Sequence, residues 1–242
     1  MKLRWYKLVS VWSTIQVSQE KRAVLFDLDG VLVRTEALKA EAHAAAVRRL
    51  GGKVSPLLYR RYMGKSHEAV RSAFLAEAGI KADLRDYTRI YQEEYRELLR
   101  QRLTVAPGAA ELLRDLVDRG FSLGLVTSSR SWMTDYVLDK TGLDAFFNVR
   151  VSAEDVKNPK PAPDSYRLAM RLIGARLGEA VAIEDSESGV EAATRAGLAV
   201  VAIRHSWNQN HDFAKAIAVF DSLQNSARIL AAIESAVAAA QV

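Results

Sequence analysis

Short runs of apolar residues recur along the chain, and most of them lead into a polar or acidic residue. Continuous apolar runs of four or five residues are typical of parallel strands that are buried on both faces. Segments with helical spacing separate most of these runs, and Gly120, Gly142 and Gly197 follow three of them, where helices commonly stop. Strands that alternate with helices indicate an α/β fold with a parallel sheet and right-handed crossovers. The predicted strands are residues 23–26, 123–126, 180–183, 199–203 and 217–220, and the predicted helices are residues 107–119, 131–141, 163–173, 187–196 and an alanine-rich segment after Asp221.

Residues 35–105 break this alternation, because they have helical periodicity and no convincing strand. One helical face within them carries large apolar side chains three or four positions apart: Leu84, Tyr87, Tyr91, Tyr95 and Leu98. We expect this stripe to form the core of the segment rather than a ligand-binding surface. The sequence therefore predicts an all-helical insertion directly after the first strand.

We divide the chain into three parts on this basis. Residues 1–20 are interpreted as an N-terminal extension, whose apolar stretch is interrupted by Ser10 and Ser13 and has no signal-peptide cleavage pattern. Residues 21–34 together with 106–242 would form the sheet domain, and residues 35–105 would form the helical domain.

Composition narrows the possible classes of protein. Hydrophobic residues make up 49% of the chain and charged residues 26%, which is typical of a globular protein. The chain has no cysteine, so disulfides, thiolate metal sites and cysteine nucleophiles are excluded. No stretch approaches the roughly 20 apolar residues that span a bilayer. We expect a cytoplasmic protein that has no membrane partner.

The positive charge of the chain is unevenly distributed. The net charge is +5, but residues 34–105 contain 15 Lys and Arg against 9 Asp and Glu, whereas residues 23–33 with 106–242 contain 14 against 19. This distribution is expected if the basic segment closes over an anionic ligand that is held by the acidic remainder of the chain. An ordinary solvated helical surface would also explain it. We do not expect nucleic-acid binding, because no recognisable module is present and the aromatic residues lie on the packing stripe.

Acidic and hydroxyl side chains follow several of the predicted strands. In a parallel α/β sheet, ligands bind beyond the carboxyl ends of the strands, so these side chains should meet. Carboxylates that converge repel one another, which implies a cation, and an all-oxygen ligand set favours Mg²⁺. The residues concerned are Asp27 and Asp29 after the first strand, Thr127, Ser128 and Ser129 after the second, and Glu184 and Asp185 after the run at 180–183.

The Asp-x-Asp-Gly segment allows two other interpretations. Taken alone, the segment could be a simple turn, since Asp and Gly are common turn residues. A calcium-binding loop begins in the same way, but Val31 stands where a third acidic ligand is needed and Leu38 occupies the twelfth position, where such loops have glutamate. The calcium interpretation is therefore excluded.

Four segments in order resemble the motifs of the haloacid dehalogenase superfamily, specifically its phosphatases and phosphomutases that carry a helical cap after the first motif. The resemblance covers residues 23 to about 225 and implies a Rossmann-like parallel sheet with an inserted all-α cap. The four segments are Asp27-Leu28-Asp29-Gly30-Val31-Leu32, Thr127-Ser128-Ser129, Lys160-Pro161-Ala162-Pro163-Asp164 and Glu184-Asp185-Ser186-Glu187-Ser188-Gly189.

The resemblance implies a role for each of the core residues. Asp27 would attack a phosphate and form an aspartyl-phosphate. Asp29 would protonate the leaving oxygen and then deprotonate the incoming water. Thr127, the backbone amide of Ser128, and Lys160 would bind the phosphate. The Mg²⁺ ligands would be Asp27, the backbone carbonyl of Asp29, Asp185, and Glu184 either directly or through water.

Candidates for substrate contact in the cap follow from the same resemblance. Thr35 and Glu36 lie where the chain enters the cap, Lys39 lies one turn later, and the family's selectivity loop corresponds to the segment containing Lys65, Ser66 and His67. Surface exposure without function is the alternative for Lys65, Ser66 and His67, and a hinge role is the alternative for Thr35 and Glu36. His205 and His211 have no metal-ligand spacing, and we expect them to be structural or exposed.

Within the superfamily, Asp29 argues against a dehalogenase and against an enzyme like phosphonoacetaldehyde hydrolase, since both lack the second Asp of the first motif. A sugar phosphomutase resembling β-phosphoglucomutase is the main alternative, but such sequences commonly carry a histidine where this chain has Lys39. A catalytically silent binding module would not need Asp29, Lys160 and the acidic pair. Motifs for ATP or NAD are absent. The sequence predicts a Mg²⁺-dependent phosphatase for small phosphorylated metabolites such as sugar or polyol phosphates.

Overall fold

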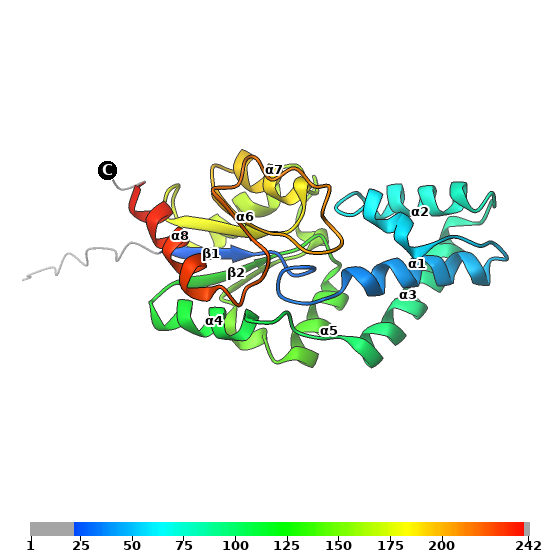
Figure 1. Cartoon of the computed structure of the whole chain (residues 1–242), viewed down its shortest axis with the longest axis horizontal. Helices are drawn as coiled ribbons and strands as arrows, with labels where there is room; N and C mark the ends of the chain where they lie inside the picture. Colours follow the sequence, from blue (N-terminus) through cyan, green and yellow to red (C-terminus); the bar gives the residue numbers. More distant parts are fainter. Residues whose placement is uncertain (1–21, 240–242) are drawn as a thin grey trace, which may run out of the picture.

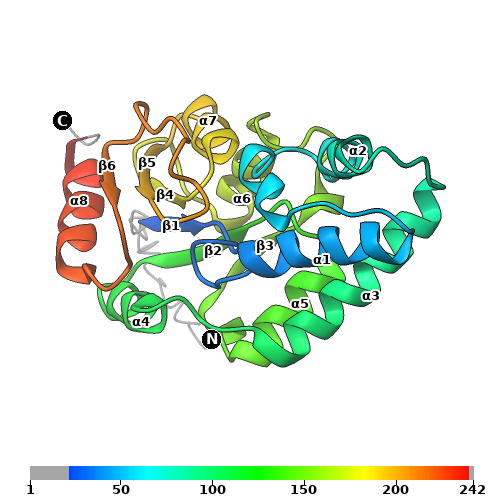
Figure 2. The same cartoon turned by 45° about the vertical axis from the view of Figure 1, so that its right-hand side comes forward.

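The computed structural model describes residues 22–239 and places six strands in one parallel sheet, with helices on both of its faces (Figure 1). The strand order is β3-β2-β1-β4-β5-β6 (Figure 2). The interpretation of residues 1–20 lies outside the described residues. Strand β1 is central, and Phe26 at its end is paired with Leu125 of β2 and Ile183 of β4. The strands are β1 (Ala23–Phe26), β2 (Ser122–Val126), β3 (Val149–Val151), β4 (Ala180–Glu184), β5 (Ala199–Ile203) and β6 (Ala218–Phe220).

Helices cover both faces of the sheet, which explains why β1 is a continuous apolar run. Val24 and Phe26 belong to the core beneath helices α4, α5 and α8, whereas Ala23 and Leu25 belong to the core beneath α6 and α7. All four side chains are fully buried. These helices are α4 (Ala109–Asp118), α5 (Ser131–Thr141), α6 (Asp164–Ile173), α7 (Glu187–Arg195) and α8 (Ser226–Ala239). The α/β fold class is thus confirmed.

Three further helices lie between β1 and β2 in the sequence and form a group beyond the carboxyl ends of the strands (Figure 2). They are α1 (Glu36–Arg49), α2 (His67–Glu77) and α3 (Leu84–Arg102), with a short 3₁₀ helix at Pro56–Arg61. Two segments join this group to the sheet, and they run side by side: the amide of Arg34 donates to the carbonyl of Thr104, and the amide of Ala106 donates to the carbonyl of Leu32.

The aromatic stripe on α3 packs largely as expected. Tyr87 and Tyr95 are fully buried and Tyr91 nearly so. The sequence pattern places Leu84 in the same core, but this residue is half exposed, because it is the first residue of α3 and lies at the end of the packed face. The side chain of Leu99, fully buried, continues the core at the other end of the helix.

The sequence pattern does not reveal β3, and it misplaces the start of α4. Strand β3 has only three residues and its central Arg150 is exposed, so it has no apolar run. Helix α4 begins at Ala109 rather than at Pro107 because Gly108 has a φ of +85°, a left-handed conformation that precedes the helix. None of the helices within residues 22–239 has the length and apolar character needed to cross a membrane.

Candidate active site

A cavity of about 370 Å³ lies between the carboxyl ends of the strands and the helical group. All the candidate catalytic, metal-binding and substrate-binding residues line it, except Thr35 and Glu184, which are buried behind its wall. The structure therefore brings together residues that are up to 158 positions apart in the sequence. The wall from the sheet side comprises Asp27, Asp29, Thr127, Ser128, Lys160 and Asp185, and the wall from the helical side includes Glu36, Lys39, Lys65, Ser66 and His67.

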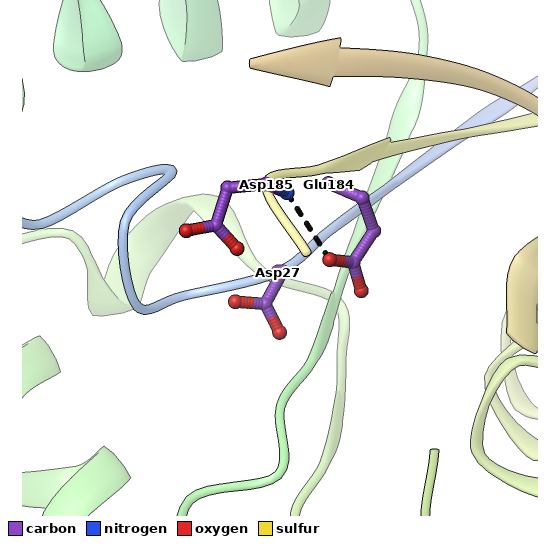
Figure 3. Close-up of side chains that lie close together, drawn as sticks. All are labelled: Asp27, Glu184 and Asp185. Carbon is purple, nitrogen blue, oxygen red and sulfur yellow. Dashed lines mark hydrogen bonds between the residues drawn. The ribbon is translucent and has the colours of Figure 1, made fainter. Parts of the chain in front are cut away.

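Three carboxylates converge at the floor of the cavity (Figure 3). Asp27 follows β1 and Glu184 ends β4, and the parallel register that pairs Phe26 with Ile183 brings the two side by side. One oxygen of Asp27, one of Glu184 and one of Asp185 lie within 4.8 Å of one another, and all three residues are buried. A compact group of buried carboxylates fits a hard divalent cation such as Mg²⁺, because oxygen ligands are what this ion prefers.

Lys160 lies against two of these carboxylates. Its Nζ is 2.6 Å from Asp27 Oδ1 and 2.6 Å from Glu184 Oε1, and it also donates to the backbone carbonyl of Val126 at 2.9 Å. Burial would lower the pKa of Lys160, but the two carboxylates outweigh this effect and raise it, so the lysine is charged. Burial raises the pKa of Asp27 well above its usual value, with Lys160 opposing the shift and the neighbouring carboxylates adding to it. One lysine faces three buried carboxylates, and a bound cation would offset their mutual repulsion.

Glu184 is held by hydrogen bonds on both carboxylate oxygens. Oε1 accepts from Tyr166 at 2.7 Å in addition to Lys160, and Oε2 accepts from the Asp185 amide at 3.1 Å, which is the dashed line in Figure 3, and from the Ser186 hydroxyl at 3.2 Å. A Cβ on Gly189 would lie about 2.0 Å from the carboxylate. The main effect of these contacts is to orient Glu184 and, through it, Lys160.

The side chain of Asp29 has a separate set of partners. Oδ1 accepts from Thr35 Oγ1 at 2.5 Å and lies 3.1 Å from Lys39 Nζ, while Oδ2 accepts from Ser129 Oγ at 2.6 Å. Burial would raise the pKa of Asp29, but Lys39 and the two hydroxyls outweigh it, and the net shift is downward. Asp29 is therefore an ionised, firmly oriented carboxylate at the edge of the cavity, next to the carboxylate cluster.

The residues after β2 line the cavity next to Lys160, which donates to the carbonyl of Val126 at the end of that strand. Thr127 is buried, and its hydroxyl accepts from the amide of Ser129 at 3.0 Å, which folds the segment into a tight turn. Ser128 is exposed to the cavity. Ser128 thus lines the same cavity as Asp27 and Asp185, where an anion could reach it.

The helical group contributes a mixed wall of cationic and aromatic side chains. Lys39 pairs with Glu36 at 2.9 Å as well as with Asp29, so it links α1 to the segment after β1. The ring of His67 lies 4.8 Å from the ring of Tyr91, and burial together with two nearby arginines lowers the pKa of His67 to about 4. Ser66 caps α2, since its Oγ accepts from the amide of Ala69 at 3.2 Å.

Several residues at the site carry no sequence signal that marks them. Tyr166 lies in α6, and its hydroxyl reaches Glu184 from the core. The expectation that His205 is merely structural or exposed is incomplete, because its Nε2 lies 2.8 Å from Asp185 Oδ2. Ser129 belongs to the second motif, which implies no separate role for it, although it contacts Asp29. Contacts of this kind depend on the fold and are not encoded in local spacing.

Comparison with known proteins agrees with this geometry. A family model described as haloacid dehalogenase-like hydrolase matches residues 24–203. The chain is 32% identical to the phosphorylated carbohydrates phosphatase of Thermotoga maritima over 81% of this chain and 92% of the relative. It is 29% identical to the phosphoglycolate phosphatase of Pseudomonas syringae pv. syringae, over 80% of this chain and 73% of the relative.

A solved structure shows the same fold. The CbbY protein of Rhodobacter sphaeroides in complex with phosphate is 27% identical, with a TM-score of 0.74 over 84% of this chain and 95% of that chain. The predicted hydrolase class and the predicted phosphatase reaction agree with the named relatives. The chain belongs to the haloacid dehalogenase-like hydrolase family.

Proposed function

We propose that the protein is a Mg²⁺-dependent phosphatase that hydrolyses small phosphorylated metabolites, in particular sugar or polyol phosphates, through an aspartyl-phosphate on Asp27. The observation that carries this proposal is that two neighbouring carboxylates, those of Asp27 and Asp29, have different surroundings. Asp27 lies in a buried carboxylate cluster, with its Oδ1 2.6 Å from Lys160 Nζ. Asp29, two residues further along the chain, is instead oriented by Thr35, Ser129 and Lys39. Carboxylates held in such different surroundings suit a nucleophile and an acid/base.

In the first step, an oxygen of Asp27 attacks phosphorus and the bond from phosphorus to the leaving oxygen breaks. The leaving oxygen keeps the electron pair and takes a proton from Asp29. Because the surroundings of Asp29 favour its ionised form, Asp29 first takes up a proton from the substrate, and a phosphate monoester bound as its monoanion carries one. The alcohol then leaves and Asp27 remains phosphorylated.

In the second step, a water molecule attacks the phosphorus of the aspartyl-phosphate. Asp29, now a carboxylate again, takes a proton from that water, and the bond between phosphorus and the Asp27 oxygen breaks. Phosphate and the free Asp27 carboxylate result, and Asp29 returns to its ionised form by passing its proton to the departing phosphate. Lys160 and the backbone amide of Ser128, together with Thr127, would bind the phosphate oxygens through both steps.

Asp27, Asp185 and the backbone carbonyl of Asp29 would hold Mg²⁺. Glu184 would contribute through water, because both of its oxygens already accept hydrogen bonds. The ion supplies positive charge that reduces the repulsion between the Asp27 carboxylate and the phosphate. The three buried carboxylates and their single buried lysine partner support this assignment.

Residues 35–105 would act as a cap over the cavity and select the substrate. The cavity of about 370 Å³ suits a small molecule, and Lys65 on the cap side favours an anionic one. His67 and Tyr91 offer ring faces and polar atoms to a sugar or polyol. The similarity to a phosphorylated carbohydrates phosphatase supports this substrate class. We place the protein in the cytoplasm, acting on small metabolites without nucleic-acid or membrane partners.

Phosphate release tests the proposal directly. The full chain is assayed against sugar phosphates, polyol phosphates, phosphoglycolate, nucleotides and an aryl phosphate, with Mg²⁺ and with EDTA, and Asp27→Asn is the control. The proposal predicts metal-dependent release that is absent from Asp27→Asn. If no compound releases phosphate but a sugar 1-phosphate is isomerised in the presence of a bisphosphate primer, the protein is a mutase instead.

A further inference from the structure

His205 contacts the candidate metal site from the loop after β5, a segment that carries none of the proposed metal ligands. It lies two residues beyond β5, which runs alongside β4, and its Nε2 lies 2.8 Å from Asp185 Oδ2. Asp185 is buried, and its carboxylate faces those of Asp27 and Glu184 in Figure 3. The imidazole therefore contacts this carboxylate from outside the group of three.

The hydrogen bonds of the ring define which nitrogen carries the proton. The amide of Trp207 donates to Nδ1 of His205 at 3.2 Å, so Nδ1 acts as an acceptor. A ring nitrogen that accepts a hydrogen bond carries no hydrogen, so the N–H of this imidazole is on the other nitrogen. That N–H is on Nε2, which makes the imidazole a donor to the Asp185 carboxylate.

The loop that carries His205 is also hydrogen-bonded to the backbone of Asp185. Asn208 is fully buried, and its Nδ2 donates to the backbone carbonyls of Asp185 at 2.7 Å and of Ile203 at 2.8 Å. The Oδ1 of the same side chain accepts from the His205 amide at 2.7 Å. The loop thus contacts Asp185 at two points, at its backbone through Asn208 and at its carboxylate through His205.

We propose that His205 is a positioning residue of the metal site, whose Nε2–H bond fixes the Asp185 carboxylate with one oxygen turned to the imidazole and the other left for the cation. This inference rests on the proposed Mg²⁺ site. Carboxylates that bind metals are commonly hydrogen-bonded by a second residue, and removal of that residue typically weakens metal affinity by about 10- to 100-fold. We expect a loss of that size because Asp185 would otherwise be free to rotate.

The test measures Mg²⁺ binding by isothermal titration calorimetry on the full, metal-stripped chain, independently of turnover. His205→Ala removes the donor, and His205→Gln replaces it with an amide that can still donate at a similar distance. Asp185→Asn provides the reference for loss of a ligand. The expected result is about 10- to 100-fold weaker binding in His205→Ala and affinity near the wild-type value in His205→Gln.

A second readout separates positioning from folding. The shift in thermal midpoint on addition of Mg²⁺ is measured for each protein against its own metal-free form, so a variant that is less stable still reports binding. The inference is overturned if His205→Ala binds Mg²⁺ as tightly as the wild type, or if His205→Gln is as weak as His205→Ala. If the wild-type chain itself binds no Mg²⁺, the proposed metal site fails instead, which is a different outcome.

Discussion

Gly30 and Asp185 approach so closely that no side chain fits between them. A Cβ on Gly30 would lie 1.8 Å from Asp185 Oδ2 and 3.0 Å from His205 Nε2, and Gly30 also has a φ of +78°. Glycine at this position therefore meets two requirements, a left-handed backbone and space for a carboxylate. Gly30 of the first motif and Asp185, which follows β4, are far apart in the sequence but adjacent in the fold.

The first prediction follows from this contact. Gly30→Ala should displace the Asp185 carboxylate and reduce both Mg²⁺ affinity and turnover by at least about tenfold, in line with losses at metal-supporting residues. Gly120→Ala is the matched control, because Gly120 has a φ of +79° and a Cβ there would meet no atom within 4 Å. Both variants should lose stability in urea unfolding because of the left-handed φ, and Gly30→Ala should lose more because its Cβ also meets Asp185. Equal metal affinity in the two variants would show that the contact with Asp185 is unimportant.

The second prediction concerns Asp29 and the leaving group. Asp29→Asn should reduce kcat on sugar phosphates by about 10²- to 10⁴-fold, because the leaving alcohol needs a proton. An aryl phosphate has a leaving group that departs without protonation, so the variant should release about one equivalent of phenol rapidly and then stall. Rapid-quench measurement of phenol and phosphate distinguishes the two steps. Equal impairment of phenol release from the aryl ester and alcohol release from the sugar ester would contradict the assigned role.

The third prediction concerns the charge of Lys160. Lys160→Met leaves Asp27 and Glu184 buried without a cation, and loss of one partner of a buried pair costs about 3–5 kcal/mol. Urea unfolding without metal should show this loss, and Mg²⁺ should restore part of it. Lys157→Met is the control, since Lys157 is an exposed lysine three positions earlier. A Lys160→Met protein as stable as the control would mean that the carboxylates carry fewer charges than we infer.

The fourth prediction uses His43, which is buried in the cap and whose Nδ1 lies 2.9 Å from the Tyr87 hydroxyl. Burial, with help from His67 and Lys39, lowers the pKa of His43 well below its usual value of 6.5. As the pH falls below about 6.5, His43 therefore becomes protonated in the unfolded chain but stays neutral in the folded chain. Stability should be complete above that pH and decline below it, by up to about 1.4 kcal/mol per pH unit for this one group.

His43→Gln keeps a polar partner for Tyr87 but cannot titrate, which makes it the control for the fourth prediction. Free energies of unfolding at neutral pH and about one unit below pH 6.5 should therefore differ less in this variant than in the wild type. The same pH dependence in both proteins would show that His43 is protonated in the folded state, or that other histidines account for the effect.

Much of the architecture was predictable because local patterns determine it. Strand β1 is a continuous apolar run since both of its faces are covered, and the acidic residues at the ends of β1 and β4 meet because the strands are parallel neighbours. Strand β3 was not predictable, because it has three residues and the central Arg150 is exposed.

The contacts that refine the site could not be derived in the same way. His205 and Tyr166 reach Asp185 and Glu184 from segments whose local sequence has no motif, and only the three-dimensional path of the chain brings them there. Ser66, one of the candidate substrate contacts, also accepts a hydrogen bond from the Ala69 amide at the N-terminus of α2. Residue type and spacing identify the atoms that can do chemistry, but the residues that orient them depend on packing.

The central claim is that Asp27 becomes phosphorylated during turnover, and chemical trapping tests it most directly. The enzyme is mixed with Mg²⁺ and its best substrate, quenched, and treated with borohydride, which reduces an aspartyl-phosphate to homoserine but leaves a free aspartate unchanged. Peptide mass spectrometry then locates the modified residue. We predict homoserine at position 27 in the wild type, with Asp29 unmodified and no product in a sample without substrate. A turnover-competent enzyme that yields no homoserine at position 27, under conditions that trap a known aspartyl-phosphate, would contradict the account.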